Sequence, residues 1–331
     1  MGTFTVGINQ QIALQYHLPA HQIVCIFSVL LPHTMHMRRI PFFPGLHLFG
    51  FSLICFSSCA SKIYRPNNTP FSNTPQQVFM RPLTITEASG IADSRKYPGH
   101  LWVQQDSGNQ PYLYLMKHDG TVVKSIYIAR CWNLDWEDMA LSAGPDSGKS
   151  YIYIGDIGDN YKSRSEYYIY RLEEPAIQSD VDTNVNRIAF RFPDGNHNSE
   201  ALLVDPVTHD IYIITKTDHQ SKVYKLSYPY STIDMNWLHE VAVLPYNYVV
   251  SAAISDKGDE ILVKTYDSIL YYTRNPEETI AQAMQKAPLR LPYLPEPQGE
   301  AITFAADNSG FFTLSEKALT TRVRLYFYKR K

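Results

Sequence analysis

One pattern occurs three times in the chain: WEDMA at residues 136–140, SEALL at 199–203 and GEAIT at 299–303. In each copy a glutamate stands at the head of an apolar, strand-like run. A second predicted strand follows each run and ends near a polar residue. The repetition predicts a fold built from several copies of one β unit.

The second strands end at regular intervals along the chain. Five such ends occur, separated by 50, 60, 50 and 50 residues: Asp106, Asp156, Lys216, Tyr266 and Glu316. A period near fifty with four strands per unit is typical of a β-propeller. We therefore predict an all-β, five-bladed propeller. Six blades are the alternative, because the insert at residues 173–186 is long and irregular.

The last unit lacks a fourth strand, and a spare strand precedes the first unit at residues 78–83. We expect the N-terminal strand to complete the last blade, since such closure leaves the ring without an open end. Helical periodicity occurs near residues 277–286, which predicts one helix between strands.

Composition excludes some classes of function. The 331 residues carry a formal net charge of -2 and scattered basic residues, so nothing favours nucleic-acid binding. The four cysteines, Cys25, Cys55, Cys59 and Cys131, have no zinc-site spacing. The chain has 24 tyrosines. Tyrosine favours β-strands, so the composition is consistent with a β-rich fold.

The N-terminal region indicates export. Residues 37–58 combine a basic start with an apolar run, and FSSC at 56–59 resembles a bacterial lipobox. We expect lipidation at Cys59, with an uncleaved membrane anchor as the alternative. Residues 1–36 are interpreted as a mis-annotated upstream extension. A flexible tether is expected over residues 59–77 and the propeller over 78–331, held at the bacterial cell envelope on the periplasmic or outer-membrane face.

Carboxylates recur at equivalent places in the units. Strand heads and strand ends of neighbouring blades converge at one mouth of a propeller channel, so we expect these residues to meet there: Glu137, Glu200, Glu300, Asp106, Asp156 and Glu316. Crowded like charges need a counterion. The hypotheses are a divalent cation, Ca²⁺ above all, a network with Lys216 and Lys264, or a cationic ligand.

Two neighbouring loops strengthen the cation hypothesis. DSGN at 106–109 and DIGDN at 156–160 place Asp and Asn oxygens around glycine, although ordinary turns have the same composition. His197 could act as an acid, a base or a ligand, or simply bond to its own loop. The chain has no Gly-x-Ser-x-Gly elbow and no phosphate-binding glycine loop.

Taken together, these motifs resemble a family of secreted bacterial β-propeller proteins, mostly uncharacterised, which is distantly similar to the esterase-like phytase propellers. The matching segments are SGIA (89–92), DSG (106–108), DWEDMA (135–140), GDIGDN (155–160), PDG (193–195), SEALL (199–203), TK (215–216), KTY (264–266), PEPQGEA (295–301) and SE (315–316). The resemblance implies a propeller fold, export, and a metal-binding or phosphoester-hydrolase role. Lys264 departs from the arginine expected in many relatives, which keeps the charge and loses the bidentate fork.

Three functions follow as hypotheses. The first is an anchored propeller that binds Ca²⁺ and an unknown small molecule or surface partner. The second is a metal-dependent hydrolase of phosphate or carboxyl esters, with Lys216, Lys264 or His197 assisting catalysis. The third is a structural propeller whose carboxylates are balanced by lysines. We expect a monomer in each case.

Overall fold

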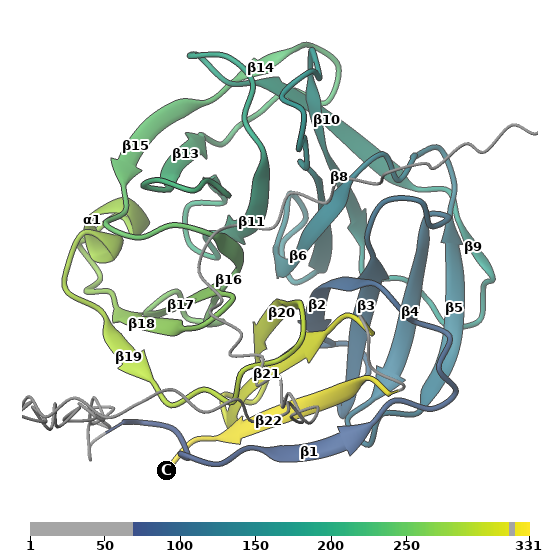
Figure 1. Ribbon diagram of the computed structural model, residues 1–331. Coiled ribbons are helices and arrows are strands. Elements are labelled where there is room, and N and C mark those ends of the chain that lie inside the picture. The colour runs from purple at the N-terminus through teal and green to yellow at the C-terminus, as the bar shows by residue number, and fades with distance from the viewer. Residues whose placement is uncertain (1–68, 318–321) are drawn as a thin grey trace, which may run out of the picture. The chain divides into compact units, whose positions relative to one another are not determined.

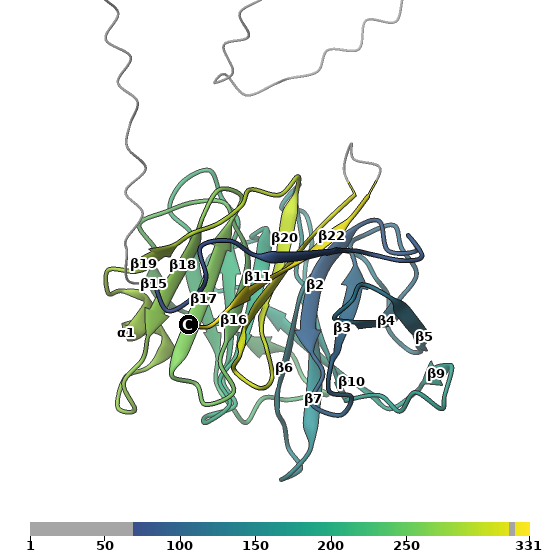
Figure 2. The same ribbon diagram turned by 90° about the horizontal axis from the view of Figure 1, so that it is seen from below.

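The protein forms a five-bladed β-propeller. The computed structural model describes residues 69–317 and 322–331. Five sheets surround a central axis in Figure 1, and Figure 2 shows the same ring from its side. The five-unit prediction is confirmed, whereas the expectations for residues 1–58, Cys59 and most of the tether lie outside the described residues.

The blades repeat one antiparallel order, from an inner strand to an outer strand. Blade one contains β2 (Ala88–Asp93), β3 (His100–Gln105), β4 (Tyr112–Lys117) and β5 (Val122–Ile128). Blade two contains β6 (Trp136–Ala143), β7 (Ser150–Asp156), β8 (Tyr167–Glu173) and β10 (Val185–Arg191). Blade three contains β11 (Ser199–Val204), β12 (Ile211–Thr215), β13 (Lys222–Leu226) and β15 (His239–Val243). Blade four contains β16 (Val249–Ile254), β17 (Glu260–Thr265), β18 (Ile269–Thr273) and β19 (Leu289–Leu291), and blade five contains β20 (Gly299–Phe304), β21 (Gly310–Ser315), β22 (Arg324–Lys329) and β1 (Gln76–Phe79).

Blade five is closed by the N-terminal strand, as predicted. β1 pairs antiparallel with β22, and the two run side by side in Figure 1. The strand begins earlier than expected, so Gln76 and Gln77 belong to the blade and not to a tether. Phe71 lies still further upstream, is fully buried, and packs edge-on against Phe311. The folded domain therefore extends upstream of Val78.

The long insert of unit two does not form a sixth sheet within the described residues. Its short strand β9 (Val181–Asp182) pairs parallel with β5 of blade one. In the same way β14 (Asn236–Trp237) leaves unit three and pairs parallel with β10 of blade two. Both strands cover an outer edge of the preceding blade, which protects that edge from pairing with other chains.

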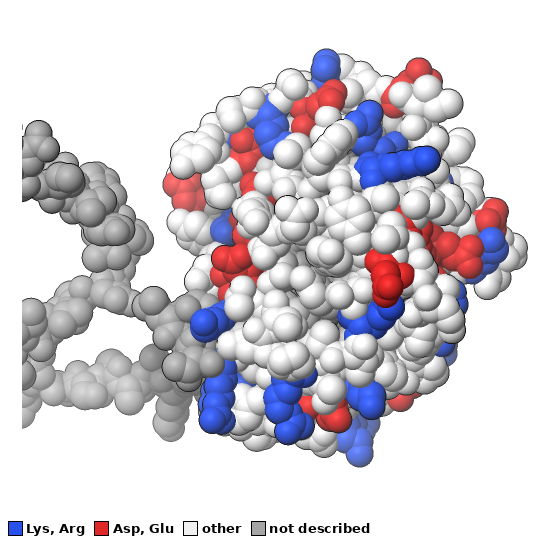
Figure 3. All heavy atoms as spheres, turned by 90° about the vertical axis from the view of Figure 1, so that its right-hand side faces the viewer, with Lys and Arg blue, Asp and Glu red and all other residues white. Residues whose placement is uncertain are grey.

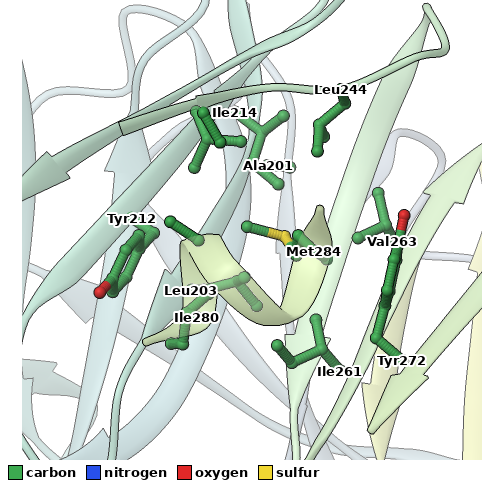
Figure 4. Close-up of a cluster of buried hydrophobic side chains, with 14 of the residues drawn as sticks. Ala201, Leu203, Tyr212, Ile214, Leu244, Ile261, Val263, Tyr272, Ile280 and Met284 are labelled. Atoms are coloured by element: carbon green, nitrogen blue, oxygen red, sulfur yellow. The ribbon is translucent and has the colours of Figure 1, made fainter. Parts of the chain in front are cut away.

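The core consists of apolar layers between successive blades. Alternation along each strand turns one set of side chains toward each neighbouring blade. The layer between blades three and four is shown in Figure 4, where Leu203 and Ile261 face the helix α1 (Ile280–Met284). Thr279 caps this helix in a reciprocal pair with Gln282, and Ile280 and Met284 are buried. Within the described ranges, no helix has the length and apolar character needed to span a membrane.

A buried carboxylate ties the inner strands together at the centre of the ring. Asp138 on β6 accepts hydrogen bonds from Leu202 N (2.9 Å) on β11 and Ala252 N (3.2 Å) on β16. It also accepts bonds from Met139 N and from Ser251 Oγ, at 2.9 and 3.0 Å. Burial raises the pKa of Asp138 well above its usual range, although its four donors oppose this effect.

The same network reaches the two remaining inner strands. Ser251 Oγ accepts a bond from Ile302 N on β20, at 3.3 Å. Ser89 on β2 donates to Trp136 O on β6, at 2.8 Å. All five inner strands are therefore linked by buried polar contacts across the channel.

We predict that Asp138→Ala lowers the free energy of unfolding by about 3 kcal/mol or more, because it leaves several buried donors without an acceptor. Asp138→Asn should also lower the free energy of unfolding, because the amide N–H of the new side chain would face backbone N–H donors that need an acceptor. Chemical denaturation measures both. Asp218→Ala, an exposed control with its side chain 71% accessible, should change stability by less than about 0.5 kcal/mol. Wild-type stability in Asp138→Ala would show that the ring closes without this network.

Candidate metal centre at the channel mouth

Each inner strand begins with a one-residue β-bulge against its neighbour in the same blade. The register shifts by one residue at the first pair in all five blades. Such a bulge re-aims the side chain of the extra residue. The bulged residues are Ser89, Glu137, Glu200, Val250 and Glu300. In blade four this position is Val250, so that blade contributes no carboxylate to it.

The residue after each second strand is the other repeated position. In four blades its backbone N–H donates to the residue two places before the bulge, and these donors are Asp106, Ile157, Lys216 and Glu316. Ile157, not Asp156, is therefore equivalent to Asp106. Asp156 lies one residue earlier, where its Oδ1 accepts from Arg164 Nη1 (2.8 Å) and from Asp135 N (3.0 Å). It fixes the loop that carries Asp135.

Three carboxylates meet at the mouth, which we call the acidic trio: Asp106, Asp135 and Glu137. One oxygen from each lies within 4.8 Å of the others. Asp135 was not predicted as a ligand, although it precedes its bulge by two residues just as Glu87 precedes Ser89. The backbone of Gly158 adjoins the trio so closely that a Cβ there would stand 2.2 Å from Glu137 Oε1 and 2.3 Å from Asp135 Oδ2.

A second group, the Lys216 cluster, occupies blades three to five at the same mouth. Lys216 Nζ lies 2.6 Å from Glu200 Oε1 and 3.9 Å from Glu300 Oε1. It also donates to Tyr266 Oη at 2.7 Å, and Tyr266 donates to Glu300 at 2.6 Å. Lys216 therefore pairs with Glu200 and makes no direct contact with the acidic trio.

Glu200 has one satisfied and one unsatisfied oxygen. Its Oε1 receives Lys216 and also Asn198 Nδ2, at 3.3 Å. Its Oε2 is buried, as only 3% of the residue is exposed, and it accepts no hydrogen bond from the described residues. A buried acceptor without a donor costs free energy in its charged form, which agrees with the raised pKa of Glu200.

Burial and mutual repulsion raise the pKa values of the mouth carboxyls. Desolvation raises the pKa of Asp106 to about 6, and the charges of Asp135 and Glu300 add to the effect. Desolvation likewise raises the pKa of Glu316 to about 8, with Glu300 and Asp106 contributing. The pKa of Glu137 is raised well above its usual range by burial and then by Glu200. Burial also raises the pKa of Glu200 to about 8, although Lys216 opposes it.

Two predicted catalytic residues are engaged in hydrogen bonds of their own, although Lys264 lies close enough to Glu300 for their charges to interact. Lys264 is fully buried and donates to Gly299 O and to Tyr293 Oη at 2.9 Å. Tyr266 lies beyond the end of β17, so alternation along the strand does not place Lys264 beside it. His197 Nε2 lies 2.9 Å from Asp194 Oδ1 and 3.0 Å from Tyr224 Oη, which matches a histidine bonded to its own surroundings.

On the face shown in Figure 3, basic and acidic side chains are interspersed. This face therefore has no dominant charge.

Comparisons with known proteins concern the fold alone. No family model matches the chain, and no curated protein matches it. A luciferin-regenerating enzyme shares 9% identity at a TM-score of 0.46, over 77% of this chain and 95% of that chain. A gluconolactonase from Xanthomonas campestris shares 10% identity at 0.42, over 73% and 72%, and the Dos1 propeller shares 12% at 0.36, over 73% and 68%. At these values the likeness carries no argument about function, and the resemblance to secreted bacterial propellers stays a prediction.

We predict that the metal-free protein loses stability as the pH rises from about 5 to 9. A carboxyl with a raised pKa binds its proton more tightly in the folded state than in the unfolded state, and this proton binding stabilises the fold. The contribution is lost as the pH rises through about 6 for Asp106 and about 8 for Glu316. Melting temperature in EDTA across this range measures the effect. Glu316→Gln should flatten the upper part of the curve, and Asp218→Asn should not. Identical slopes in Glu316→Gln and the parent would contradict the assignment.

Proposed function

We propose that the channel mouth binds a divalent hard cation, Ca²⁺ above all, through Asp106, Asp135 and Glu137. The observation that carries the proposal is the acidic trio itself, in which three partly or fully buried carboxylates converge within 4.8 Å. Burial is the main cause that raises their pKa values, their mutual repulsion adds to it, and Arg164 and Lys216 oppose it only in part at Asp135.

The residues present fit such an ion. Ca²⁺ takes six to eight oxygen ligands with flexible geometry, and carboxylates are the ligands it prefers. The trio offers oxygens from two adjacent blades, and the close approach of Gly158 leaves their carboxylates uncrowded by a side chain. Water or a bound ligand would supply the remaining oxygens. The role of the bound cation would be to hold that ligand at the mouth.

We predict that Ca²⁺ binds the metal-stripped protein with one site and releases protons at pH 7, because binding must displace protons from carboxyls of raised pKa. Isothermal titration calorimetry in two buffers of different ionisation enthalpy measures both quantities. Glu137→Gln should weaken binding by at least about tenfold, since it removes one charged ligand. Asp218→Asn, an exposed acidic control, should bind as the parent does. No heat and no thermal stabilisation with Ca²⁺, Mg²⁺ or Zn²⁺ would contradict the proposal.

Hydrolysis of an ester is the second candidate. It is favoured by Lys216 and Tyr266, whose mutual hydrogen bond places two polar donors beside the carboxylates. A bound cation would lower the pKa of a water, and these donors would stabilise negative charge that develops on the substrate. Lys216 is already paired with Glu200, so this function requires that pair to open or to act as a unit.

We predict, for this candidate, that Ca²⁺-loaded protein hydrolyses a carboxyl ester faster than a phosphomonoester, because the excess of carboxylates repels a dianion. Turnover of p-nitrophenyl acetate and p-nitrophenyl phosphate measures this. Lys216→Met should abolish turnover while Ca²⁺ affinity is kept, whereas Lys162→Met, an exposed control, should have no effect. No turnover of either substrate by the loaded parent would remove the candidate and leave the cation site untouched.

We further propose that the protein is exported and anchored through a lipid on Cys59, on the strength of the lipobox-like segment at 56–59. Expression in a bacterium with radiolabelled palmitate should label the parent and leave Cys59→Ala unlabelled. Cys131→Ala, a change of a buried thiol, should keep the label. Labelling that persists in Cys59→Ala would identify a different acceptor.

A further inference from the structure

We propose that the seam between blades five and one binds a small anionic amphiphile, which is a molecule with one acidic head group and an apolar body. The inference is independent of the cation site, because it concerns a part of the surface that the proposed function does not use. It starts from a groove of about 640 Å³, which we call the seam groove and which is lined by residues 78–81, Leu83, Asp119 and Arg322. This volume is within the range of small-ligand pockets.

The seam groove lies where the closing strand leaves blade five and reaches blade one. β1 runs along β22, and the chain then continues to blade one, as Figure 1 shows. Met80 N donates to Val323 O at 3.1 Å, which fixes the end of β1 on blade five. Arg81 N donates to Gly120 O at 2.7 Å, and Val122 N donates to Arg81 O at 2.9 Å. The backbone of the groove is therefore held by both blades.

The packing beneath these bonds makes the groove a preformed feature. Gly120 has a φ of 85°, which favours glycine, and a Cβ there would stand 2.4 Å from Phe79 O. Met80 is only 5% exposed and packs with Val78 in the apolar layer between blades five and one. The floor of the groove is thus part of the core, and a ligand would not have to open it.

Two large apolar side chains of the lining remain accessible. Phe79 and Leu83 are each 37% exposed. Both follow directly from the strand that closes the ring, so their positions are fixed by the fold and do not depend on a long loop. An apolar ligand body that covers them would remove apolar surface from water, which favours binding.

The polar part of the groove is basic. The Cζ atoms of Arg322 and Arg324 lie 4.8 and 4.9 Å from the centre of the Phe79 ring. A guanidinium group stacked on a ring keeps its N–H groups in its own plane, where they can donate to a carboxylate or phosphate. Arg81 adds a third guanidinium group from the lining. Among the described lining residues Asp119 alone is acidic, and its Oδ1 accepts from the backbone of its own turn, at 2.9 Å.

Charge and shape together select the ligand class. A cationic head group would face three arginines at an electrostatic cost. An inorganic anion would satisfy the arginines but would leave Phe79 and Leu83 in water. The groove is concave and suits one molecule, whereas an anionic bilayer would bring many head groups against Asp119. A single acidic head group on a short apolar chain meets each of these requirements.

Matched eight-carbon ligands test the class. We would record saturation-transfer NMR titrations of the full-length protein with octanoate, octylammonium and acetate, below the concentrations at which micelles form. We expect saturable binding of octanoate, weaker binding of octylammonium, and no detectable binding of acetate. Octanoate should bind equally with and without EDTA, since the acidic trio takes no part. Co-sedimentation with phosphatidylglycerol vesicles would examine the bilayer separately.

Groove variants test the location. Arg81→Gln and Leu83→Asn should each weaken octanoate binding at least about fivefold, because one removes a charged donor and the other removes apolar contact. Arg81→Lys, which keeps the charge, should retain most of the affinity. The matched controls are Arg187→Gln, whose guanidinium group lies 5.1 Å from the ring of Tyr168, and Val207→Asn, which is 68% exposed in the parent. Both should bind as the parent does, and thermal melting would show that every variant is folded.

Each contrary outcome overturns a stated part of the proposal. Absence of saturable octanoate binding would overturn the site itself. Octylammonium that binds as tightly as octanoate would overturn the acidic head group, and acetate that binds as tightly would overturn the apolar body. Equal octanoate binding by the parent, Arg81→Gln and Leu83→Asn would place the ligand elsewhere. Vesicle binding that is lost in Arg81→Gln, without binding of octanoate, would overturn the small ligand in favour of a membrane surface.

Discussion

The hydrogen bonds accepted by the buried carboxyl of Asp138 hold the inner ring of this propeller together. Blades are joined along most of their length by apolar layers, which are strong but do not specify direction. A carboxylate that must satisfy donors on β11 and β16 at once fixes how the inner strands approach one another. Since Ser251 and Ser89 extend the contacts to the remaining strands, the inner strands are joined around a polar centre.

Closure of the ring also brings the first residues of the inner strands close together. Carboxyl groups at these positions then repel one another at the mouth. Every inner strand begins with a bulge, and in three blades the bulged residue is a glutamate. The fold therefore concentrates carboxyls where burial and repulsion raise their pKa values. Lys216 and Tyr266 resolve part of this repulsion in blades three to five. Between blades one and two, no lysine of the described residues contacts the acidic trio in this way, and Arg164 reaches only the neighbouring Asp156, so we propose that a divalent cation balances the remaining charge.

The repeat was readable from the sequence because strand alternation and the fifty-residue period are local properties. The five blades and the closure by the N-terminal strand follow from them. The bulges were not readable, because an extra residue in one strand leaves no mark in composition. Asp156 was taken as the equivalent of Asp106, but it is the last residue of β7, and the equivalent position is Ile157. Asp135 could have been found by applying to unit two the spacing that links Glu87 to Ser89. The burial of Lys264 could not be predicted, because it depends on the neighbouring blade, where Gly299 O accepts a hydrogen bond from its ammonium group.

The central claim is that these constraints make a cation site of the acidic trio. Its most direct test is an anomalous difference map from crystals grown with Ca²⁺ and measured at long wavelength. The account predicts one strong peak at about 2.3–2.6 Å from carboxylate oxygens of Asp106, Asp135 and Glu137. A well-ordered mouth with no peak, in which Glu137 instead contacts Lys216, would contradict it.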